Sequence, residues 1–330
     1  MLFAGSRGVV GLLLAVVGLA GGASLLPSTA AAGPGAAGLV HPTTGAPWPR
    51  YTLRADGIWQ LNLPGGQRFD ASGLFLTPEG ELLTESDRGA GVYRILFHPG
   101  VRAADLLRLP DCFSDAQLAP FAAEKVGRYD CEGVTRDAQG RLYLCEEANR
   151  WILRWDPVTK QVERLAIDWK PVEKYFDPID RNASFEGITV AGAKLYVANE
   201  RKVGRIIAVD LATLKVVDDF AARPYGCTAR DVHYSDLCWF DGALYALLRE
   251  SWVVLKINPA THRVLAEYNY RDMEQDPDVV YRNQYPTGVM EGLAVSRDQF
   301  WLVTDNNGRA RARHRHDRRP TLFHCPRPDR

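Results

Sequence analysis

The sequence predicts an all-β protein, a β-propeller built from four-stranded antiparallel blades. A pattern of two short hydrophobic strands around a turn recurs five times, at intervals of roughly 50–60 residues. A third and a fourth strand follow several of these pairs, which gives the four strands of a propeller blade. Apart from residues 115–124, no stretch has the periodicity of an amphipathic helix. We count five blades, and a ring of six with one degenerate blade stays open as the alternative.

The composition is that of an ordinary globular chain. Of the 330 residues, 46% are hydrophobic and 24% are charged, which argues against a disordered, collagen-like or multi-span membrane protein. Forty Lys and Arg balance forty Asp and Glu. A general nucleic-acid binder needs an excess of positive charge to neutralise phosphates. We therefore expect no nucleic-acid partner, although local basic clusters remain compatible with this balance.

The N-terminal segment has the pattern of a secretory signal peptide. Arg7 is the only formally charged side chain before Arg50, and residues 9–20 form an apolar run. Small residues follow, and residues 30–32 offer a cleavage site of the A-x-A kind. The alternative is an uncleaved membrane anchor over residues 9–26, but so short a glycine-rich run spans a bilayer poorly.

The predicted organisation follows from this pattern. Residues 1–32 are expected to be a signal peptide and residues 33–50 a flexible linker. Residues 51–330 are expected to form one propeller domain. We therefore expect a secreted or periplasmic protein, monomeric, with no stable membrane span after cleavage.

The cysteines form an even set, which favours disulfides in an oxidising compartment. They are Cys112, Cys131, Cys145, Cys227, Cys238 and Cys325. None has the C-x-x-C spacing of a thiolate zinc site. We expect at least one disulfide. Cys227 with Cys238 is one candidate, and Cys131 with either Cys145 or Cys112 is another.

The strands of the repeats can be placed in order. The first strands begin at positions 72, 132, 186, 235 and 291, and the second strands at positions 82, 142, 195, 244 and 300. Third strands are recognised at 151–157, 205–210 and 252–259, with fourth strands beginning near 162, 216 and 264. The last repeat ends after a third strand at 321–326. Residues 51–63 are predicted to supply its missing outer strand, which would leave the ring without an exposed edge.

The repeats bring carboxylates to one mouth of the central channel. The first strands begin with Ser72, Glu132, Glu186, Ser235 and Glu291, and the second strands end with Asp87, Glu147, Glu200, Arg249 and Asp305. In a blade these two positions share one rim, so the carboxylates would repel one another unless a positive charge lies among them. Oxygen ligands at this density suit Ca²⁺. The predicted metal ligands are Glu132, Glu186, Glu291, Glu147, Glu200 and Asp87.

Two other interpretations of the rim stay open. The carboxylates could only cap backbone N–H groups at the strand starts. Arg88, Arg201 and Arg249 lie on the same rim and could pair with the acids without a metal, or could hold an anionic substrate. His233 is the histidine near a first-strand start and is the candidate general base. The basic run 309–319 is interpreted as a solvated loop of the last blade.

Residues 132–150 and 186–201 resemble a known family. Each combines an E-G-[ILV] strand start with an acidic and amide-rich strand end. In this they resemble the family described as the esterase-like activity of phytase, and the related SdiA-regulated propellers, from Asp70 to the C-terminus. The resemblance implies an exported calcium-binding propeller with esterase or phosphoesterase activity. The residues that match its motif are Glu132, Glu186, Glu291, Glu147, Glu200 and Asp87.

The fourth repeat departs from this motif, since Ser235-Asp236 replaces Glu-Gly and Arg249 replaces the acid. The Asp-Asp-Pro-type motif associated with β-propeller phytases is also missing, which argues against phytate as the substrate. The leading hypothesis is a Ca²⁺-dependent hydrolase of a small ester or phosphoester, in which the metal polarises the reacting oxygen and arginines offset the developing charge. The competing hypothesis is a non-catalytic, calcium-stabilised binding or scaffold propeller, because propellers serve both purposes.

Overall fold

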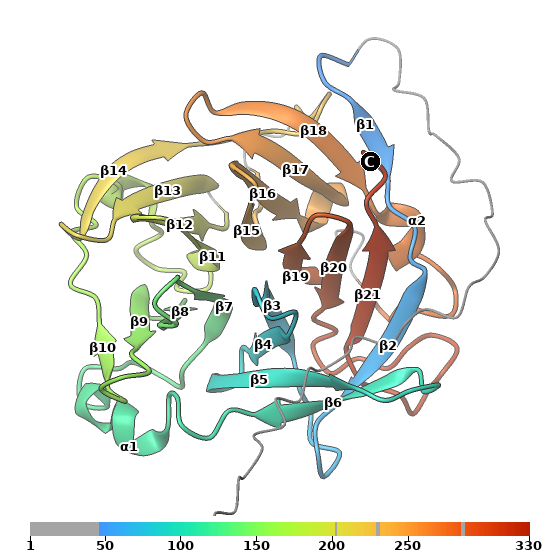
Figure 1. Cartoon of the computed structure of the whole chain (residues 1–330), viewed down its shortest axis with the longest axis horizontal. Helices are drawn as coiled ribbons and strands as arrows, with labels where there is room; N and C mark the ends of the chain where they lie inside the picture. The colour runs from blue at the N-terminus through green and yellow to red at the C-terminus, as the bar shows by residue number, and fades with distance from the viewer. Residues whose placement is uncertain (1–45, 202, 229–231, 285–287) are drawn as a thin grey trace, which may run out of the picture.

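The computed structural model describes residues 46–330 except 202, 229–231 and 285–287. The predicted signal peptide and residues 33–45 of the predicted linker lie outside the described residues. Viewed down the short axis, the chain forms a ring of sheets around a central channel (Figure 1). The predicted fold class is confirmed, because the described residues are built almost entirely of antiparallel sheets.

Five blades make up the ring, each with its first strand innermost. The first blade contains β3 (Ala71–Leu76), β4 (Leu82–Ser86), β5 (Gly89–Phe97) and β6 (Ala103–Arg108). The second contains β7 (Cys131–Arg136), β8 (Leu142–Glu146), β9 (Trp151–Trp155) and β10 (Val162–Arg164). The third contains β11 (Phe185–Ala191), β12 (Lys194–Asn199), β13 (Arg205–Asp210) and β14 (Lys215–Phe220). The fourth contains β15 (Asp236–Phe240), β16 (Ala243–Leu248), β17 (Val253–Asn258) and β18 (Arg263–Asn269). The fifth contains β19 (Met290–Val295), β20 (Gln299–Thr304), β21 (Thr321–Pro326) and the N-terminal β2 (Gly57–Asn62).

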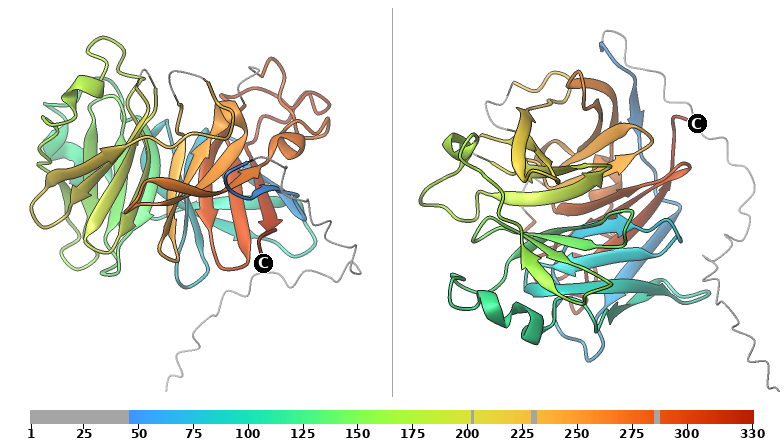
Figure 2. Two further views of the ribbon diagram at one scale, coloured as in Figure 1. Left: turned by 90° about the horizontal axis from the view of Figure 1, so that it is seen from above. Right: turned by 60° about the vertical axis from the view of Figure 1, so that its left-hand side comes forward.

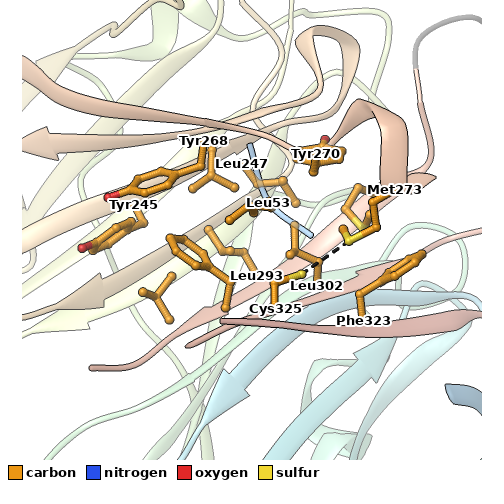
Figure 3. Close-up of a cluster of buried hydrophobic side chains, with 14 of the residues drawn as sticks. Leu53, Tyr245, Leu247, Tyr268, Tyr270, Met273, Leu293, Leu302, Phe323 and Cys325 are labelled. Atoms are coloured by element: carbon orange, nitrogen blue, oxygen red, sulfur yellow. Dashed lines mark hydrogen bonds between the residues drawn. The ribbon is translucent and has the colours of Figure 1, made fainter. Parts of the chain in front are cut away.

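The hydrophobic core lies between the blades. Five clusters of buried apolar side chains occupy the five interfaces between neighbouring blades. Figure 3 shows the cluster between the fourth and fifth blades, where Tyr245 and Tyr268 face Leu293 and Leu302. Because both faces of a blade are covered, the second strands β4, β8 and β16 are buried along their whole length. This explains why the sequence shows hydrophobic runs there instead of alternation.

The N-terminal segment closes the ring, as predicted, but in two pieces. β2 pairs with β21 in antiparallel register, from Gly57 opposite His324 to Gln60 opposite Thr321. It also pairs in parallel with β6, so the first and fifth blades form one continuous eight-stranded sheet. The prediction of a single strand over 51–63 is wrong at its start, because β1 (Arg50–Thr52) runs in parallel along β18 of the fourth blade.

The predicted linker is also too long at its C-terminal end. Arg50 forms an ion pair with Glu267, with 2.9 Å between Nε and Oε1. Trp48 packs edge-on against Tyr225. Leu53 is buried in the interface between the fourth and fifth blades. The chain is therefore attached to the propeller before residue 50.

The two faces of the ring differ in their connections. Seen from the side, tight turns occupy one face and longer connections project from the other (Figure 2). These longer connections include α1 (Asp115–Leu118), α2 (Arg271–Glu274) and the three short 3₁₀ turns at Ala119–Phe121, Glu173–Tyr175 and Arg249–Ser251. They start at the ends of the second and fourth strands, on the same face as the predicted carboxylate rim. Among the described residues, no helix has the length and apolar character needed to cross a bilayer.

The prediction of at least one disulfide is not borne out, because all six cysteines are free thiols. Cys131 points into the interface between the first and second blades, whereas Cys145 points into that between the second and third. Adjacent strands place these two side chains on opposite faces of one sheet, where disulfide geometry cannot be met. Cys238 instead accepts a hydrogen bond from the backbone N–H of Val295 at 3.3 Å, so it packs against the fifth blade and not on Cys227.

Candidate metal centre at the channel mouth

We call the residues at the starts of the five inner strands the rim residues: Ser72, Glu132, Glu186, Ser235 and Glu291. In four of these strands a glycine follows the rim residue and allows close packing. A Cβ atom on Gly187 would lie 2.4 Å from Cα of Asp236, and one on Gly133 would lie 2.8 Å from the carbonyl oxygen of Glu186. The inner strands therefore approach one another too closely for any side chain at these positions. The pairing register also shifts at the start of β3, β7, β11 and β19, but not in β15. Such bulges re-aim side chains, and here they occur at the rim residues.

Asp236 explains why the fourth repeat lacks the glycine. Its Oδ2 accepts hydrogen bonds from the backbone N–H groups of Leu293 at 2.7 Å and Leu74 at 3.3 Å, and its Oδ1 from that of Leu237 at 2.7 Å. One fully buried carboxylate thus connects the inner strands β3, β15 and β19. Burial raises the pKa of Asp236 well above its usual range, against the effect of these N–H donors.

The repeats are equivalent at the rim in their backbone as well. In four repeats the same backbone hydrogen bond joins the two strands. The donor is the N–H of the residue that follows the second strand, and the acceptor is the carbonyl of the residue two positions before the rim residue. These donor–acceptor pairs are Asp87 to Asp70, Glu147 to Asp130, Glu200 to Ser184 and Asp305 to Val289. Residues two apart in a strand share one face. The position two before the rim residue therefore belongs to the site, although the sequence analysis did not include it.

Two groups of three carboxylates meet at Glu147. Asp130, Glu132 and Glu147 form one group, and Glu147, Glu186 and Glu200 form the other. Within each group, one oxygen from each residue lies within 4.8 Å of the others. Glu147 is 1% exposed and Glu200 is fully buried, whereas Asp130 and Glu132 are half-buried and open to the channel mouth. We call these five residues the carboxylate cluster.

The proximity of these carboxylates changes their ionisation. Burial, followed by the charge of Glu147, raises the pKa of Glu132 well above its usual range. Burial and the charge of Glu200 do the same to the pKa of Glu147 and of Glu186. Glu132 accepts no hydrogen bond within the described part of the chain. The cluster therefore carries an electrostatic cost that a bound cation would remove.

Arginines neutralise one side of the rim. Nη2 of Arg249 lies 2.6 Å from Oε1 of Glu200, and Nη1 of Arg249 pairs with Glu291. Arg201 adds a second guanidinium to Glu200, with 2.9 Å between Nη1 and Oε2. The structure thus brings Glu132, Glu147, Glu186 and Glu200 together and places Glu291 apart from both groups, in an ion pair with Arg249.

Asp87 belongs to a separate part of the rim with Asp70 and Asp305. Asp70 is fully buried and pairs with Arg68 at 2.6 Å and with the predicted Arg88 at 3.5 Å. Burial and the charge of Asp70 raise the pKa of Asp87 to about 6 and that of Asp305 to about 7. Arg68 and Asp70 were missed by the sequence analysis, since they precede the first recognised strand.

His233 lies beside the carboxylate cluster in contact with a partner that was not predicted. Its Nδ1 lies 2.7 Å from Oε1 of Glu250. The hydrogen bond from His233 lowers the pKa of Glu250, despite partial burial. His233 occupies the repeat position two before the rim residue Ser235, the same position as Asp130 and Ser184. Because Nδ1 contacts Glu250, Nε2 is the ring nitrogen left to accept a proton.

The residues present fit a hard cation. Glu147 accepts a hydrogen bond from the backbone N–H of Ser184 at 3.3 Å, while the buried hydroxyl of Ser184 has no partner within the described residues. Oδ1 of Asp130 lies 3.9 Å from Nη2 of Arg128, whereas Glu132 and Glu147 form no ion pair within the described residues. Carboxylate oxygens, together with an unpaired hydroxyl oxygen, are the donor set of Ca²⁺. In the group of Asp130, Glu132 and Glu147, the half-buried Asp130 and Glu132 are the residues that an ion can reach.

Comparisons with known proteins agree with this fold. A family model described as phytase-like, the esterase-like activity of phytase, matches residues 67–308. A search of curated proteins found no match. Among solved structures, the Myxococcus xanthus glutaminyl cyclase is similar at 14% identity, with 84% of this chain and 96% of that chain covered and a TM-score of 0.55. A streptogramin B lyase is similar at 11% identity, with 75% and 80% of the two chains covered and a TM-score of 0.43. At 14% identity the likeness to the glutaminyl cyclase is one of fold alone.

Proposed function

The chain belongs to the phytase-like family, described as the esterase-like activity of phytase, and from this premise we propose that it is a Ca²⁺-dependent hydrolase of a small ester or phosphoester. Family membership supports a hydrolase-type function. The observation that carries the metal dependence is the position of Glu147, which shares two groups of carboxylates whose oxygens lie within 4.8 Å of one another.

Asp130, Glu132 and Glu147 would hold the ion, with Ser184 beside them. Calcium bound there would supply a Lewis acid that polarises the acyl or phosphoryl oxygen of the substrate. The surrounding residues fix this geometry. Glu200 is held in place by ion pairs with Arg201 and Arg249.

The candidate catalytic side chains surround the cluster. Arg249 and Arg201 are partly exposed, so each can donate to an anionic oxygen of the substrate while it holds Glu200. Arg88 stands across the mouth beside Asp70. His233, held by Glu250 through Nδ1, is the general-base candidate, because Nε2 remains to accept a proton from water.

The test is hydrolysis of a panel of p-nitrophenyl esters and phosphates, with calcium and with EDTA. We expect calcium-dependent turnover of at least one substrate class, and a loss on the order of a hundredfold or more in Glu147→Gln. The matched control is Glu79→Gln, because Glu79 is an exposed residue at the opposite face that pairs with Arg136. Turnover that survives EDTA and Glu147→Gln unchanged would refute the proposal.

A second candidate function is a non-catalytic binding or scaffold propeller. It is favoured by the ion pairs of Arg249 with Glu200 and Glu291, which balance part of the rim without a metal. Calcium binding measured by calorimetry, without turnover of any substrate on the panel, would select this alternative.

Export, a small-molecule substrate and a monomeric state complete the proposal. The apolar segment and small residues of the N-terminal region support export. Expression of the whole chain with recovery from the periplasm or medium, followed by mass measurement, tests both processing and export. Retention of the unprocessed chain in the cytoplasm would contradict the proposed export. Light scattering measures whether the protein is a monomer.

A further inference from the structure

A groove of about 520 Å³ lies at the outer edge of the second blade, outside the carboxylate cluster. Its walls are the start of β9 with the turn before it, residues 149–151, and the end of β10 with the connection that follows it, residues 164–176 (Figure 1). Its apolar lining residues are Trp151, Leu165, Ala166, Ile167, Trp169 and Phe176. A concave, largely apolar site of this volume is typical of pockets for small molecules. We call it the aromatic groove.

Three aromatic rings form the walls, and each is fixed by packing against another ring. Trp169 packs against the fully buried Phe185, with 4.7 Å between the ring centroids, and Phe176 meets the same ring edge-on at 5.5 Å. Trp151 packs edge-on against Phe121. Trp151, Trp169 and Phe176 are nevertheless only half-buried. The groove therefore offers apolar ring surface in a fixed arrangement, against which a further aromatic ring can pack.

The same walls carry positive charge. Arg150 and Lys170 line the groove and form no ion pair with a carboxylate among the described residues. Arg164 also lines it and pairs with Glu124, with 2.6 Å between Nη1 and Oε2. Glu173 is the one carboxylate among the described lining residues. The groove therefore has a positive charge that its own side chains do not balance.

Arg150 is held at the groove by neutral groups. Its Nη2 donates to the carbonyl of Asp177 at 2.6 Å, and its guanidinium carbon lies 5.2 Å from the centroid of the Phe176 ring. Its buried Nε has no hydrogen-bond partner within the described residues. Burial, followed by the charge of Arg181, lowers the pKa of Arg150. A bound anion would supply the missing counter-charge.

Apart from the two indole N–H groups, neutral hydrogen-bonding groups are scarce in the groove. The side chain of Asn149 is occupied, because it donates to Glu146 at 3.1 Å and accepts from the backbone N–H of Val126 at 2.8 Å. No Ser, Thr, Tyr or Gln is among the described lining residues. The hydroxyls of a sugar ring would be left unpaired there, at a cost in free energy. The groove therefore suits an apolar ring with one charged group better than it suits a saccharide.

We propose that the aromatic groove binds an aromatic carboxylate, a flat ring that carries one carboxylate. The ring would pack against Trp151, Trp169 and Phe176, and its carboxylate would pair with Arg150 and lie near Lys170. A guanidinium can stack on an aromatic face and still donate in-plane hydrogen bonds to a carboxylate. This site goes beyond the proposed hydrolysis and does not depend on it, because none of its lining residues belongs to the carboxylate cluster.

The test measures binding to the whole protein by isothermal titration calorimetry in metal-free buffer with EDTA, so that the result is independent of any metal-dependent hydrolysis. The probes are 2-naphthoate, its neutral amide 2-naphthamide, and glucuronate, a ring carboxylate without an aromatic face. We expect 2-naphthoate to bind, and each of the other two to bind about tenfold more weakly or less. The proposal is overturned if 2-naphthoate does not bind, or if the amide binds as tightly. Glucuronate binding as tightly as 2-naphthoate would also overturn it, in favour of a saccharide site.

Arg150→Gln should weaken the binding of 2-naphthoate by about tenfold or more and remove its advantage over the amide. The matched control is Arg154→Gln, because Arg154 is another arginine that lies over an aromatic ring, that of Tyr143, but outside the groove. The exposed Lys170→Gln should weaken binding by about threefold, with the exposed Lys194→Gln as its control. This second pair decides the result if Arg150→Gln lowers the melting temperature. Equal losses of affinity in a variant and its control would overturn the proposal.

Discussion

Asp236 and the inner-ring glycines show how single residues shape the centre of this propeller. Gly73, Gly133, Gly187 and Gly292 let neighbouring strands approach, and Asp236 uses the space to accept N–H groups from three strands. The departure of the fourth repeat from the Glu-Gly motif is thus a structural adaptation. It removes one acid from the rim and places another in the channel below it.

Asp305 gives the rim a pH dependence whose sign follows from its pKa. Burial and the charge of Asp70 raise this pKa to about 7, compared with about 3.9 for a free aspartate. The folded protein holds the proton more tightly than the unfolded chain does. The resulting stabilisation is complete below the unfolded pKa and is lost as the pH rises through the folded pKa.

In metal-free buffer, Asp305→Asn should therefore raise the free energy of unfolding by only about 1.5 kcal/mol near pH 5 and by up to about 4 kcal/mol near pH 8. The side-chain oxygen of Asn can still accept the hydrogen bond from the backbone N–H of Asn307. Urea denaturation at the two pH values measures the effect, with the exposed Asp298→Asn as control. An equal change at both pH values would contradict the assignment.

The N-terminal strands differ in what they stabilise. β1 adds a parallel edge to β18, and the ion pair between Arg50 and Glu267 is partly exposed. β2 fills the gap between β21 and β6 and has neighbours on both sides. Removal of β2 therefore leaves two unpaired strand edges within the ring, whereas removal of β1 uncovers only an outer edge.

A chain that begins at residue 53 keeps the buried Leu53 and should remain monomeric with a modestly lower melting temperature. A chain that begins at residue 64 should aggregate. Size-exclusion chromatography and thermal melts of both truncations measure the difference. If the shorter chain were as soluble and as stable as the longer one, the closure by β2 would have no energetic role.

At the scale of an element, strand order and the shared rim could be predicted from sequence because both depend on repeated local pattern. The five strand starts, four of them Glu-Gly or Ser-Gly, and the turns that follow them each lie within one hairpin. The parallel pairing of Arg50–Thr52 with β18 could not be predicted, because it joins residues more than two hundred positions apart and has no repeat partner. The predicted disulfide between Cys131 and Cys145 is wrong, because sequence spacing does not reveal that the two side chains face different blade interfaces.

Across the whole molecule, the site was predictable only where the repeats contribute to it equally. Glu132, Glu147, Glu186 and Glu200 gather as their equivalent positions imply. Glu291 does not join them, because the fourth repeat places Arg249 against it. The aromatic groove was not foreseen, since residues 164–176, which form much of its wall, belong to a connection that the repeats do not share.

Calcium should stabilise the folded molecule as a whole, because the carboxylate cluster exists only in the native ring. A hundredfold excess over Kd contributes about 2.7 kcal/mol, which corresponds to a rise in Tm on the order of 4–5 °C for a chain of this size. Glu132→Gln should remove most of this rise, because Glu132 is one of the three residues proposed to hold the ion, and Glu79→Gln should not. Differential scanning fluorimetry with calcium and with EDTA measures it. If the wild-type Tm is the same with calcium and with EDTA, the glutamates only cap backbone N–H groups at the strand starts.

The joint between β2 and β21 also determines when the molecule can finish folding. Asp56 and His324 are hydrogen-bonded across 268 positions of the chain, so this contact forms only after nearly all of the polypeptide is available. The inner hairpins can assemble earlier, since their partners are close in sequence. Until β2 meets β21, the fifth blade has three strands and an open edge, and closing so long a loop costs entropy that only the final pairing offsets. We therefore expect the fifth blade to be completed late in folding, and an incomplete fifth blade would offer its open edge to a strand of a neighbouring chain.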